Sequence, residues 1–546
     1  MFNLLLVLFT LFGLTCAVPI DLPRSIHDMR TQHLSKRTNS TKFVVAHFMV
    51  GNSYPYTVDN WLSDIQLAHQ SGIDGFALNV GTDSWQPQQV ANAYEAAQQS
   101  GTGFKLFMSF DMSSLPCSTA ADAATLRNYI TTYATHPNQF LYNGRVFAST
   151  FSGESCTFGQ GSVVSGWSSQ FIQQLSGSNA VYFVPSFFVD TSTFSTYSGV
   201  IDGMFNWNSA WPVQVTTSYA SSILGAIGNI LQNPSSALNS LSSLVGSTTP
   251  DQQYINALNA MGDTKTYMAA VSPWFFTHYS PQTYNKNWIY LSDDHLYAKR
   301  WESLVQIRDQ VDIVECLTWN DYGESHYLGP IEGDQPNSQA WVDGFDHTGL
   351  SIVTYFVRFV PYVFTGWLNL TLYYATAFKT GSYPSVTKDQ IVMWSRPHPA
   401  LATAPDPVGQ PQNFQITEDK VWAVVLATSS GTVTLSTSSS QSQTFSVSAG
   451  VSKLTIPITS GGYMAATLSR NGQTVINLKS TNFTFNPNPP SVQLQCTCHF
   501  FRLSSGSGNH PHARRVDCDR SIFFSEETCW LCITLQFVFC RRVRIG

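Results

Sequence analysis

The chain has 546 residues, of which 43% are hydrophobic and only 11% are charged, and its formal net charge is −6. Soluble domains average about 25% charged residues, and Ser, Thr, Asn, Gln and Tyr take the place of the missing charges here. This composition argues against a nucleic-acid binder with a basic surface and against a multispan membrane protein. At ~100–200 residues per domain the length favours about two to four domains, although an α/β barrel can use ~250 residues alone.

Residues 1–17 have the pattern of a signal peptide. The apolar run Leu4–Leu14 precedes Thr15-Cys16-Ala17, small residues that suit cleavage, and the run is too short to span a ~30 Å hydrocarbon core. A basic stretch then ends at Lys36-Arg37. We interpret residues 18–37 as a propeptide cut at this dibasic pair, the alternative being a solvated charge pair. With the sequons at Asn39, Asn369 and Asn482, the pattern predicts a secreted glycoprotein.

From residue 43 onward the chain alternates strand and helix patterns. Short β-branched and aromatic runs are separated by polar segments of helical length, such as 61–71 and 89–100. The runs are Phe43–Val50, Gly75–Gly81, Lys105–Asp111, Arg145–Gly153, Val181–Asp190, Gly203–Trp211, Thr266–Phe276 and Asp312–Trp319. This alternation indicates parallel pairing through crossover connections. The predicted fold is therefore α/β, with a catalytic (β/α)8 TIM barrel over residues 38–381.

Polar residues follow the ends of several of these runs, where the active site of such a barrel lies. Asp111, Glu154, Trp207 and Trp274 are candidates there, against the alternatives of helix capping and ordinary packing. Two cysteines, Cys117 and Cys156, lie just past the third and fourth runs. These runs are neighbours in a barrel, so we expect a disulfide in a secreted chain, whereas Cys316 inside the eighth run is expected to be a buried thiol.

The eighth run ends in the densest group of polar residues, Trp319-Asn320-Asp321-Tyr322-Gly323-Glu324, followed by Ser325-His326-Tyr327. Two neighbouring carboxylates among aromatic side chains are what glycosidic bond cleavage requires, because one donates a proton and the other activates water or attacks the sugar. A metal site at Asp321, Glu324 and His326 is the competing interpretation. Since no second histidine has suitable spacing, we predict no metal ligand.

Beyond residue 382 the pattern changes to short alternating strands with Ser, Thr and Gly turns, which predicts an all-β sandwich over residues 382–486. The expected strands are Val421–Thr428, Gly431–Leu435, Gln443–Val447, Lys453–Pro457, Gly462–Ser469 and Gln473–Leu478. Before it, helices are expected at 348–364 and in the Ser/Ala/Leu-rich insertion 216–250. The tail 487–546 gains six cysteines and an Arg-rich end without a repeated zinc spacing. We interpret this tail as a disordered segment or a gene-model artefact.

Several motifs occur together in a fixed order: Val45–Asn52, Gly72–Asn79, Phe107–Met112, Phe151–Glu154, Val271–Phe276, Lys286–Trp288 and Thr318–Ser325. Over roughly residues 42–486 the chain thereby resembles fungal glycoside hydrolase family 71, the α-1,3-glucanases or mutanases. The resemblance implies hydrolysis of α-1,3-glucan with inversion at the anomeric carbon, on a (β/α)8 barrel followed by a β-sandwich and without a cofactor. The insertion at 216–250 departs from the family pattern.

The paired acids of the family would fall on Asp321 and Glu324. We assign Glu324 as general acid, with a pKa raised by apolar and like-charged surroundings, and Asp321 as general base, and leave the reverse assignment open. The expected sugar contacts are Asp111, Glu154, Trp207, Trp274, Trp319, Tyr322, His326 and Tyr327.

These interpretations predict a secreted, possibly wall-associated, endo-acting enzyme whose partner is the glucan, expected to be a monomer without nucleic-acid or membrane partners. The competing hypothesis is a wall-associated glucan-binding protein that has lost turnover.

Overall fold

The structure, a computed structural model, describes residues 41–223, 241–262, 265–333, 335, 338, 366–406, 408–480, 483–489 and 497–502. All of these belong to the first of two units, Met1–Leu503 and Ser504–Gly546. The predicted signal peptide, propeptide and helix 348–364 lie outside the described residues, as do Asn39, Asn482, most of the tail and residues 224–240 of the insertion.

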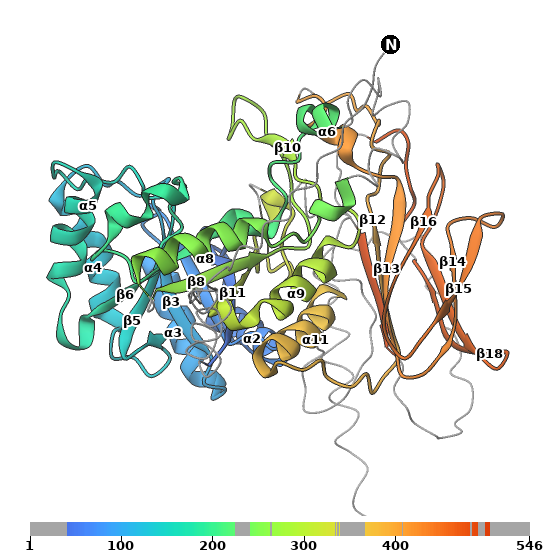
Figure 1. The fold of residues 1–546 in the computed structure, drawn as a ribbon, viewed down its shortest axis with the longest axis horizontal. Coiled ribbons are helices and arrows are strands. Elements are labelled where there is room, and N and C mark those ends of the chain that lie inside the picture. Colours follow the sequence, from blue (N-terminus) through green and yellow to red (C-terminus); the bar gives the residue numbers. More distant parts are fainter. Residues whose placement is uncertain are drawn as a thin grey trace, which may run out of the picture. The chain divides into compact units, whose positions relative to one another are not determined.

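A curled parallel sheet forms the first part of the structure (Figure 1). Its strands are β1 (Phe43–Met49), β2 (Gly75–Val80), β3 (Lys105–Asp111), β5 (Arg145–Phe151), β6 (Val181–Phe183), β7 (Gly203–Asn206), β8 (Thr266–Val271) and β11 (Ile313–Cys316). Parallel ladders join them in the order β6-β5-β3-β2-β1-β11-β8-β7. Each expected strand is thus present, although several end earlier than predicted.

The two end strands of this order, β6 and β7, are joined by backbone hydrogen bonds outside the ladders. Asp202 N donates to Phe183 O at 2.8 Å, and Phe205 N donates to Pro185 O at 2.9 Å. A short strand, β4 (Leu141–Tyr142), pairs antiparallel with β5.

Helices cover one face of the parallel sheet. They are α2 (Val58–Gln70), α3 (Gln86–Ser100), α4 (Ala120–Tyr133), α5 (Val163–Gly166), α8 (Thr249–Met261), α9 (Leu296–Gln306) and α11 (Gly366–Thr380). A further helix, α6 (Thr217–Ile223), instead contacts the segment around Phe414–Ile416, where Thr217 bonds Asn413 and Gln415. The start of α2 follows from Thr57, whose hydroxyl caps Asn60 N in a capping box. In the part of the chain that is described, no helix combines the length and apolarity needed to cross a bilayer.

Alternating residues of the strands divide between two hydrophobic clusters, as the two faces of a pleated strand require. One cluster joins strand residues such as Phe48 and Phe76 to the helix residues Trp61, Val90 and Trp301. The other receives one residue from every parallel strand, namely Val45, Ala77, Phe107, Phe147, Tyr182, Phe205, Met268 and Ile313. The concave face of the curled sheet is therefore filled by side chains.

Two antiparallel sheets follow in the sequence. One has the order β16-β13-β12-β19 and the other the order β15-β14-β17-β18, and their buried side chains form one hydrophobic cluster. The strands are β12 (Gln390–Ser395), β13 (Lys420–Ala427), β14 (Gly431–Ser436), β15 (Ser442–Val447), β16 (Gly450–Pro457), β17 (Ala465–Arg470), β18 (Gln473–Lys479) and β19 (Thr497–Arg502). The six expected strands are present, whereas β12 was not expected and β19 lies within the predicted tail.

The first of these sheets contacts the helices that cover the parallel sheet. Trp394 of β12 and Trp367 of α11 have ring centroids 4.9 Å apart. Arg396 donates to Asp293 at 2.6 Å, with both side chains buried, and His295 Nε2 lies 3.0 Å from the carbonyl of Leu454. These contacts are of the kind that buttress a neighbouring domain.

One glycosylation prediction is corrected. Asn369 lies inside α11 and is only 8% exposed, while the hydroxyl of Thr371 in the same sequon bonds the carbonyl of Trp367 and the hydroxyl of Tyr297. A buried helical amide leaves no room for a glycan in the folded protein.

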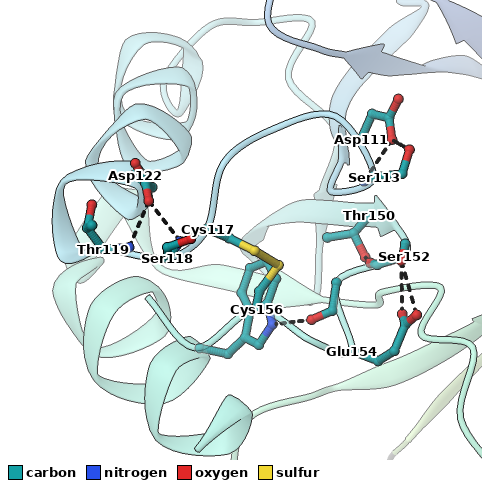
Figure 2. Close-up of a disulfide and its surroundings, with 12 residues drawn as sticks. Asp111, Ser113, Cys117, Ser118, Thr119, Asp122, Thr150, Ser152, Glu154 and Cys156 are labelled. Atoms are coloured by element: carbon teal, nitrogen blue, oxygen red, sulfur yellow. Dashed lines mark hydrogen bonds between the residues drawn. A yellow bond between two sulfur atoms is a disulfide. The ribbon is translucent and has the colours of Figure 1, made fainter. Parts of the chain in front are cut away.

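The predicted disulfide is confirmed. Cys117, after β3, is bonded to Cys156, after β5, and Figure 2 shows the bridge beside the loops that carry Asp111 and Glu154. Cys316 is a free, buried cysteine, as expected.

We expect the double variant Cys117→Ser/Cys156→Ser to lose about 2–4 kcal/mol of unfolding free energy, because the bridge closes a loop with a sequence separation of 39 residues. Denaturant unfolding with and without a thiol reductant measures this loss. Reductant should destabilise the wild type and leave the double variant unchanged, and equal stability of both oxidised proteins would contradict the prediction.

Candidate active site

The segment after β11 is held against the end of β1. Asn320 accepts a hydrogen bond from Met49 N at 2.7 Å and donates to Met49 O at 3.1 Å, and Trp319 N donates to His47 O at 2.6 Å. The side chain of Asn320 thus continues the pairing of β1 with β11 beyond the last ladder residue. This clamp places the following residues at the carboxyl edge of the sheet, where barrel active sites lie.

The two predicted acids lie at the ends of one short turn. Asp321 precedes the 3-10 helix Tyr322–Glu324, and the hydroxyl of Thr318 accepts a hydrogen bond from Asp321 N at 2.8 Å. Ser325 ends the turn with φ of +62°, in the left-handed region. The side chains of Asp321 and Glu324 are 15% and 16% exposed, so both can meet a ligand.

His326 lies beneath the pair and is completely buried. Its Nε2 is 3.4 Å from Asp321 Oδ2 and 3.4 Å from Glu324 Oε2. Its ring packs against Trp211 and Phe275, with ring centroids 5.6 and 5.4 Å away. The structure therefore brings these three residues together, with the histidine on the protein side.

Lys286 supplies a second positive charge. It precedes β10 (Asn287–Ile289), which pairs with β9 (Phe276–His278) in the connection after β8. Its Nζ donates to Glu324 Oε1 at 2.8 Å, so Lys286 and His326 approach different oxygens of the same carboxylate.

The two cations determine the ionisation of the pair. Burial alone would raise the pKa of Glu324, but His326 and Lys286 outweigh it and lower the pKa to about 2. Burial alone would lower the pKa of His326, but Asp321 and Glu324 raise it to about 8. The expectation that the surroundings of Glu324 raise its pKa is therefore wrong, because sequence spacing did not show Lys286 or the buried side of His326.

The pair opens into a cavity of about 490 Å³. Its lining includes Asp111, Lys286, Tyr279 and Tyr284, together with the amides Asn52, Asn79 and Gln86. Gly323 permits Tyr279 to lie close to the turn, because a Cβ at position 323 would lie 2.1 Å from the hydroxyl oxygen of Tyr279. The cavity is thus walled by hydroxyl, amide and phenol groups around five charged residues, Asp83, Asp111, Lys286, Asp321 and Glu324.

Four of the expected sugar contacts are corrected by burial. Trp319, Tyr322, His326 and Tyr327 have no exposed surface. Tyr322 donates to the carbonyl of Pro330 at 2.9 Å and packs edge-on against Tyr327. These side chains support the turn from below and do not face the cavity.

The other four expected contacts, Asp111, Glu154, Trp207 and Trp274, differ in their positions. Trp274 is 5% exposed and its indole donates to the carbonyl of Ser325, so it holds the turn. Trp207 is 8% exposed and packs edge-on against His47. Asp111 lines the cavity, whereas Glu154 accepts from Ser152 Oγ at 3.1 Å and is not part of that lining (Figure 2).

Sequence reasoning missed Lys286, Tyr279 and Tyr284. All three lie in the excursion between β8 and α9, whose signals in the sequence were the motifs Val271–Phe276 and Lys286–Trp288. Tyr284 is 59% exposed and lines the cavity.

A curled parallel sheet with two accessible carboxylates after its last strand, in a cavity of neutral polar groups, is an arrangement typical of glycoside hydrolases. The comparisons with known proteins define the class further. The model of Glycosyl hydrolase family 71 matches residues 40–494, and the chain belongs to this family.

Curated relatives match along most of their length. The chain is 40% identical over 442 residues to the glucan endo-1,3-alpha-glucosidase agn1 of Schizosaccharomyces pombe, covering 80% of this chain and 90% of that protein. It is 31% identical to a mutanase of Penicillium rubens, covering 80% and 84%, and 34% identical to the ascus wall endo-1,3-alpha-glucanase of S. pombe, covering 80% and 91%. Among solved structures, a GH99 endo-alpha-mannosidase from Bacteroides thetaiotaomicron gives a TM-score of 0.40 at 11% identity, over 63% of this chain and 99% of that one. That likeness is too low to carry an argument.

The charge on His326 predicts a pH dependence of stability. The folded-state pKa of about 8 exceeds the ordinary 6.5, so its contribution is complete below pH 6.5 and is lost as the pH rises through 8. We expect the unfolding free energy to fall by on the order of 1–2 kcal/mol across this window in the wild type and by less in His326→Asn. Denaturant unfolding at several pH values measures both slopes. Burial lowers the pKa of His295 and His398, so these two titrate below the window, and equal slopes in both proteins would contradict the assignment.

Proposed function

We propose that this chain is a secreted endo-acting hydrolase of α-1,3-glucosidic bonds in fungal wall glucan. The observation that carries the proposal is the pair Asp321 and Glu324, accessible at one cavity in a chain of glycosyl hydrolase family 71. The names of the relatives agree with the substrate: two are endo-1,3-α-glucanases and one is a mutanase. The ascus wall relative and the signal pattern of residues 1–17 support an extracellular or wall location.

We infer further that the parallel sheet is a closed (β/α)8 barrel followed by a β-sandwich. The backbone hydrogen bonds of Asp202 and Phe205 bridge β6 to β7, the one neighbouring pair without a ladder among the described strands. One side chain from each parallel strand enters the same interior cluster, as layers of a barrel do. The shared core of the two antiparallel sheets supports the sandwich.

The cavity suits a neutral polysaccharide. Tyr279 and Tyr284 form a T-shaped pair with ring centroids 4.8 Å apart, and such rings stack on the apolar faces of sugars. The amides Asn52, Asn79 and Gln86 are donors and acceptors for sugar hydroxyls. We keep Asp111 and Glu154 as proposed contacts to the hydroxyl groups of the sugar.

For the acid and base we propose the reverse of the assignment made from sequence. Glu324 is held ionised by Lys286 and His326, so it is suited to take a proton from water as the general base. Asp321 has no lysine partner and contacts His326 alone among the described cations. Asp321 is therefore the proposed general acid, which protonates the leaving glycosidic oxygen.

Inversion at the anomeric carbon, implied by the family resemblance, is part of the proposal. One oxygen of Asp321 and one of Glu324 lie within 4.8 Å of each other, below the ~6.5–9.5 Å between the carboxyl groups of inverting enzymes. NMR of the first anomer released decides between the two outcomes. A β-anomer at the new reducing end supports inversion, and an α-anomer overturns it.

Asp321→Asn and Glu324→Gln are each expected to lower kcat on insoluble α-1,3-glucan by about 10²–10⁴-fold, because each removes a group that transfers a proton. Binding to the insoluble glucan should persist. Reducing-end release and sedimentation with the polymer measure the two properties. The matched controls are Asp59→Asn and Glu95→Gln, both exposed on helices.

Near-wild-type turnover in either pair variant removes that residue from its role. A wild-type protein that binds the glucan but releases no reducing ends supports the competing hypothesis of a glucan-binding protein without turnover.

Lys286→Met should raise the pKa of Glu324, because it removes a cation 2.8 Å from that carboxylate. A base must be ionised to act, so the acidic limb of the kcat/KM profile should move to higher pH. The limb is measured on a soluble α-1,3-linked oligosaccharide. Lys105→Met, whose ammonium bonds the carbonyl of Pro137, serves as the control, and an unmoved limb in Lys286→Met would show that Glu324 is not the base.

A further inference from the structure

An inverting mechanism leaves its two carboxylates in the wrong protonation states after each turnover. The acid has given its proton to the leaving oxygen, and the base has taken one from water. The pair must exchange a proton before the next cleavage. This requirement rests on the proposed function, and the structure holds one group that can meet it.

His326 is the polar group that the two carboxylates share. Its Nε2 lies 3.4 Å from Asp321 Oδ2 and from Glu324 Oε2. Neither ring nitrogen has a hydrogen-bond partner within the described residues, and the ring is enclosed by Trp211 and Phe275. Burying a protonated imidazole without a hydrogen-bond partner on either nitrogen costs free energy. The negative charges of Asp321 and Glu324 must therefore compensate the positive charge of His326. Contacts of this length are common in unliganded sites and shorten in the substrate complex.

We propose that His326 is a proton relay between Asp321 and Glu324, holding the catalytic proton in the resting enzyme and passing it to the acid for each cleavage. In the forward half, His326 Nε2–H protonates Asp321, and Asp321 passes the proton to the glycosidic oxygen as the C–O bond breaks, which leaves His326 neutral. In the return half, Glu324 takes a proton from the attacking water as the new C–O bond forms, and gives it to the neutral His326. The net reaction is addition of one water across one glycosidic bond, and the three protein groups, Asp321, Glu324 and His326, end as they began.

The other charged groups at the site leave this route open. Lys286 bonds Glu324 Oε1, whereas His326 faces Oε2, so the two cations do not compete for one oxygen. Burial lowers the pKa of Lys286, but Glu324, Asp321 and Asp111 outweigh it and raise that pKa, so the ammonium keeps its proton. Burial also raises the pKa of the phenols Tyr279 and Tyr290, which therefore stay neutral.

A relay differs from a merely structural histidine in its effect on the pH profile. While His326 carries the proton, activity should persist until the imidazolium is lost, with the pKa of about 8. Without a titrating group at 326, Asp321 must take its proton from solvent, and the basic limb should move to lower pH. His326→Gln keeps a donor in this place but cannot be protonated.

The test compares the kcat/KM profiles of the wild type and His326→Gln on a soluble α-1,3-linked glucan oligosaccharide. We expect the basic limb to move by about three pH units to the acid side, about a 100-fold loss of activity at pH 7, with activity partly kept at the acidic end. His69→Gln, an exposed histidine of α2, is the control. An unmoved limb with lower kcat would make His326 a positioning residue only, and a folded variant that is inactive at every pH would also overturn the relay.

A second measurement does not depend on turnover. In the protein labelled with 15N-histidine, the pKa of His326 should fall in Asp321→Asn and again in Glu324→Gln, because each carboxylate contributes to holding its proton. A pKa that is unchanged in either variant would overturn the shared proton. A wild type that fails to cleave the glucan would instead remove the proposed function, so the two failures are distinguishable.

Discussion

The site depends on the hydrogen bonds that fix the segment after β11 to the end of β1. Asn320 forms two hydrogen bonds with the backbone of Met49, and Trp319 N bonds the carbonyl of His47. A side-chain amide that imitates a backbone pair allows the chain to leave the sheet without leaving donors unpaired. The next residue, Asp321, is thereby placed at the carboxyl edge, and the left-handed turn at Ser325 brings His326 back under it.

Charge balance is the second constraint. Two carboxylates close together repel, and one would be expected to carry a proton if they stood alone. Here Lys286 and His326 provide two positive charges against Asp321 and Glu324, and they approach different oxygens of Glu324. The pair is consequently asymmetric, since only one carboxylate has both cations. This asymmetry, and not the order of the residues in the chain, distinguishes the acid from the base.

Much of the fold could be predicted because the β-branched and aromatic runs coincide with buried strands. The predicted ends of the strands were less accurate: the run 181–190 contains a strand of only three residues, Val181–Phe183. Its aromatic residues continue into the loop on the site side, where Phe187 is buried. The motif after the eighth run identified Asp321 and Glu324, since paired acids among aromatics have few structural uses. The disulfide followed from the neighbouring positions of two strands in the predicted barrel.

What could not be predicted depends on long-range contacts. Lys286 is separated from Glu324 by 38 residues in sequence, and no periodicity shows that the excursion after β8 folds back over the turn. The aromatic residues of the motif gave a misleading signal for a related reason. Trp319 and Tyr322 are typical of sugar platforms, but they fill the space beneath the turn, while the exposed ring belongs to Tyr284.

The low charge content of the chain, 11%, acquires a meaning at this site. A neutral polymer offers no charge by which a protein could bind it, so a surface rich in charged groups would bring desolvation costs without matching contacts. The cavity accordingly has amides and phenols on its walls, and the two carboxylates at its turn face Lys286 and His326. Because Asp321, Glu324, His326 and Lys286 neutralise one another, the site can bind an uncharged chain and still move a proton along a short path. The low charge content of the whole chain and the compensated charges at this one turn therefore both suit a neutral substrate.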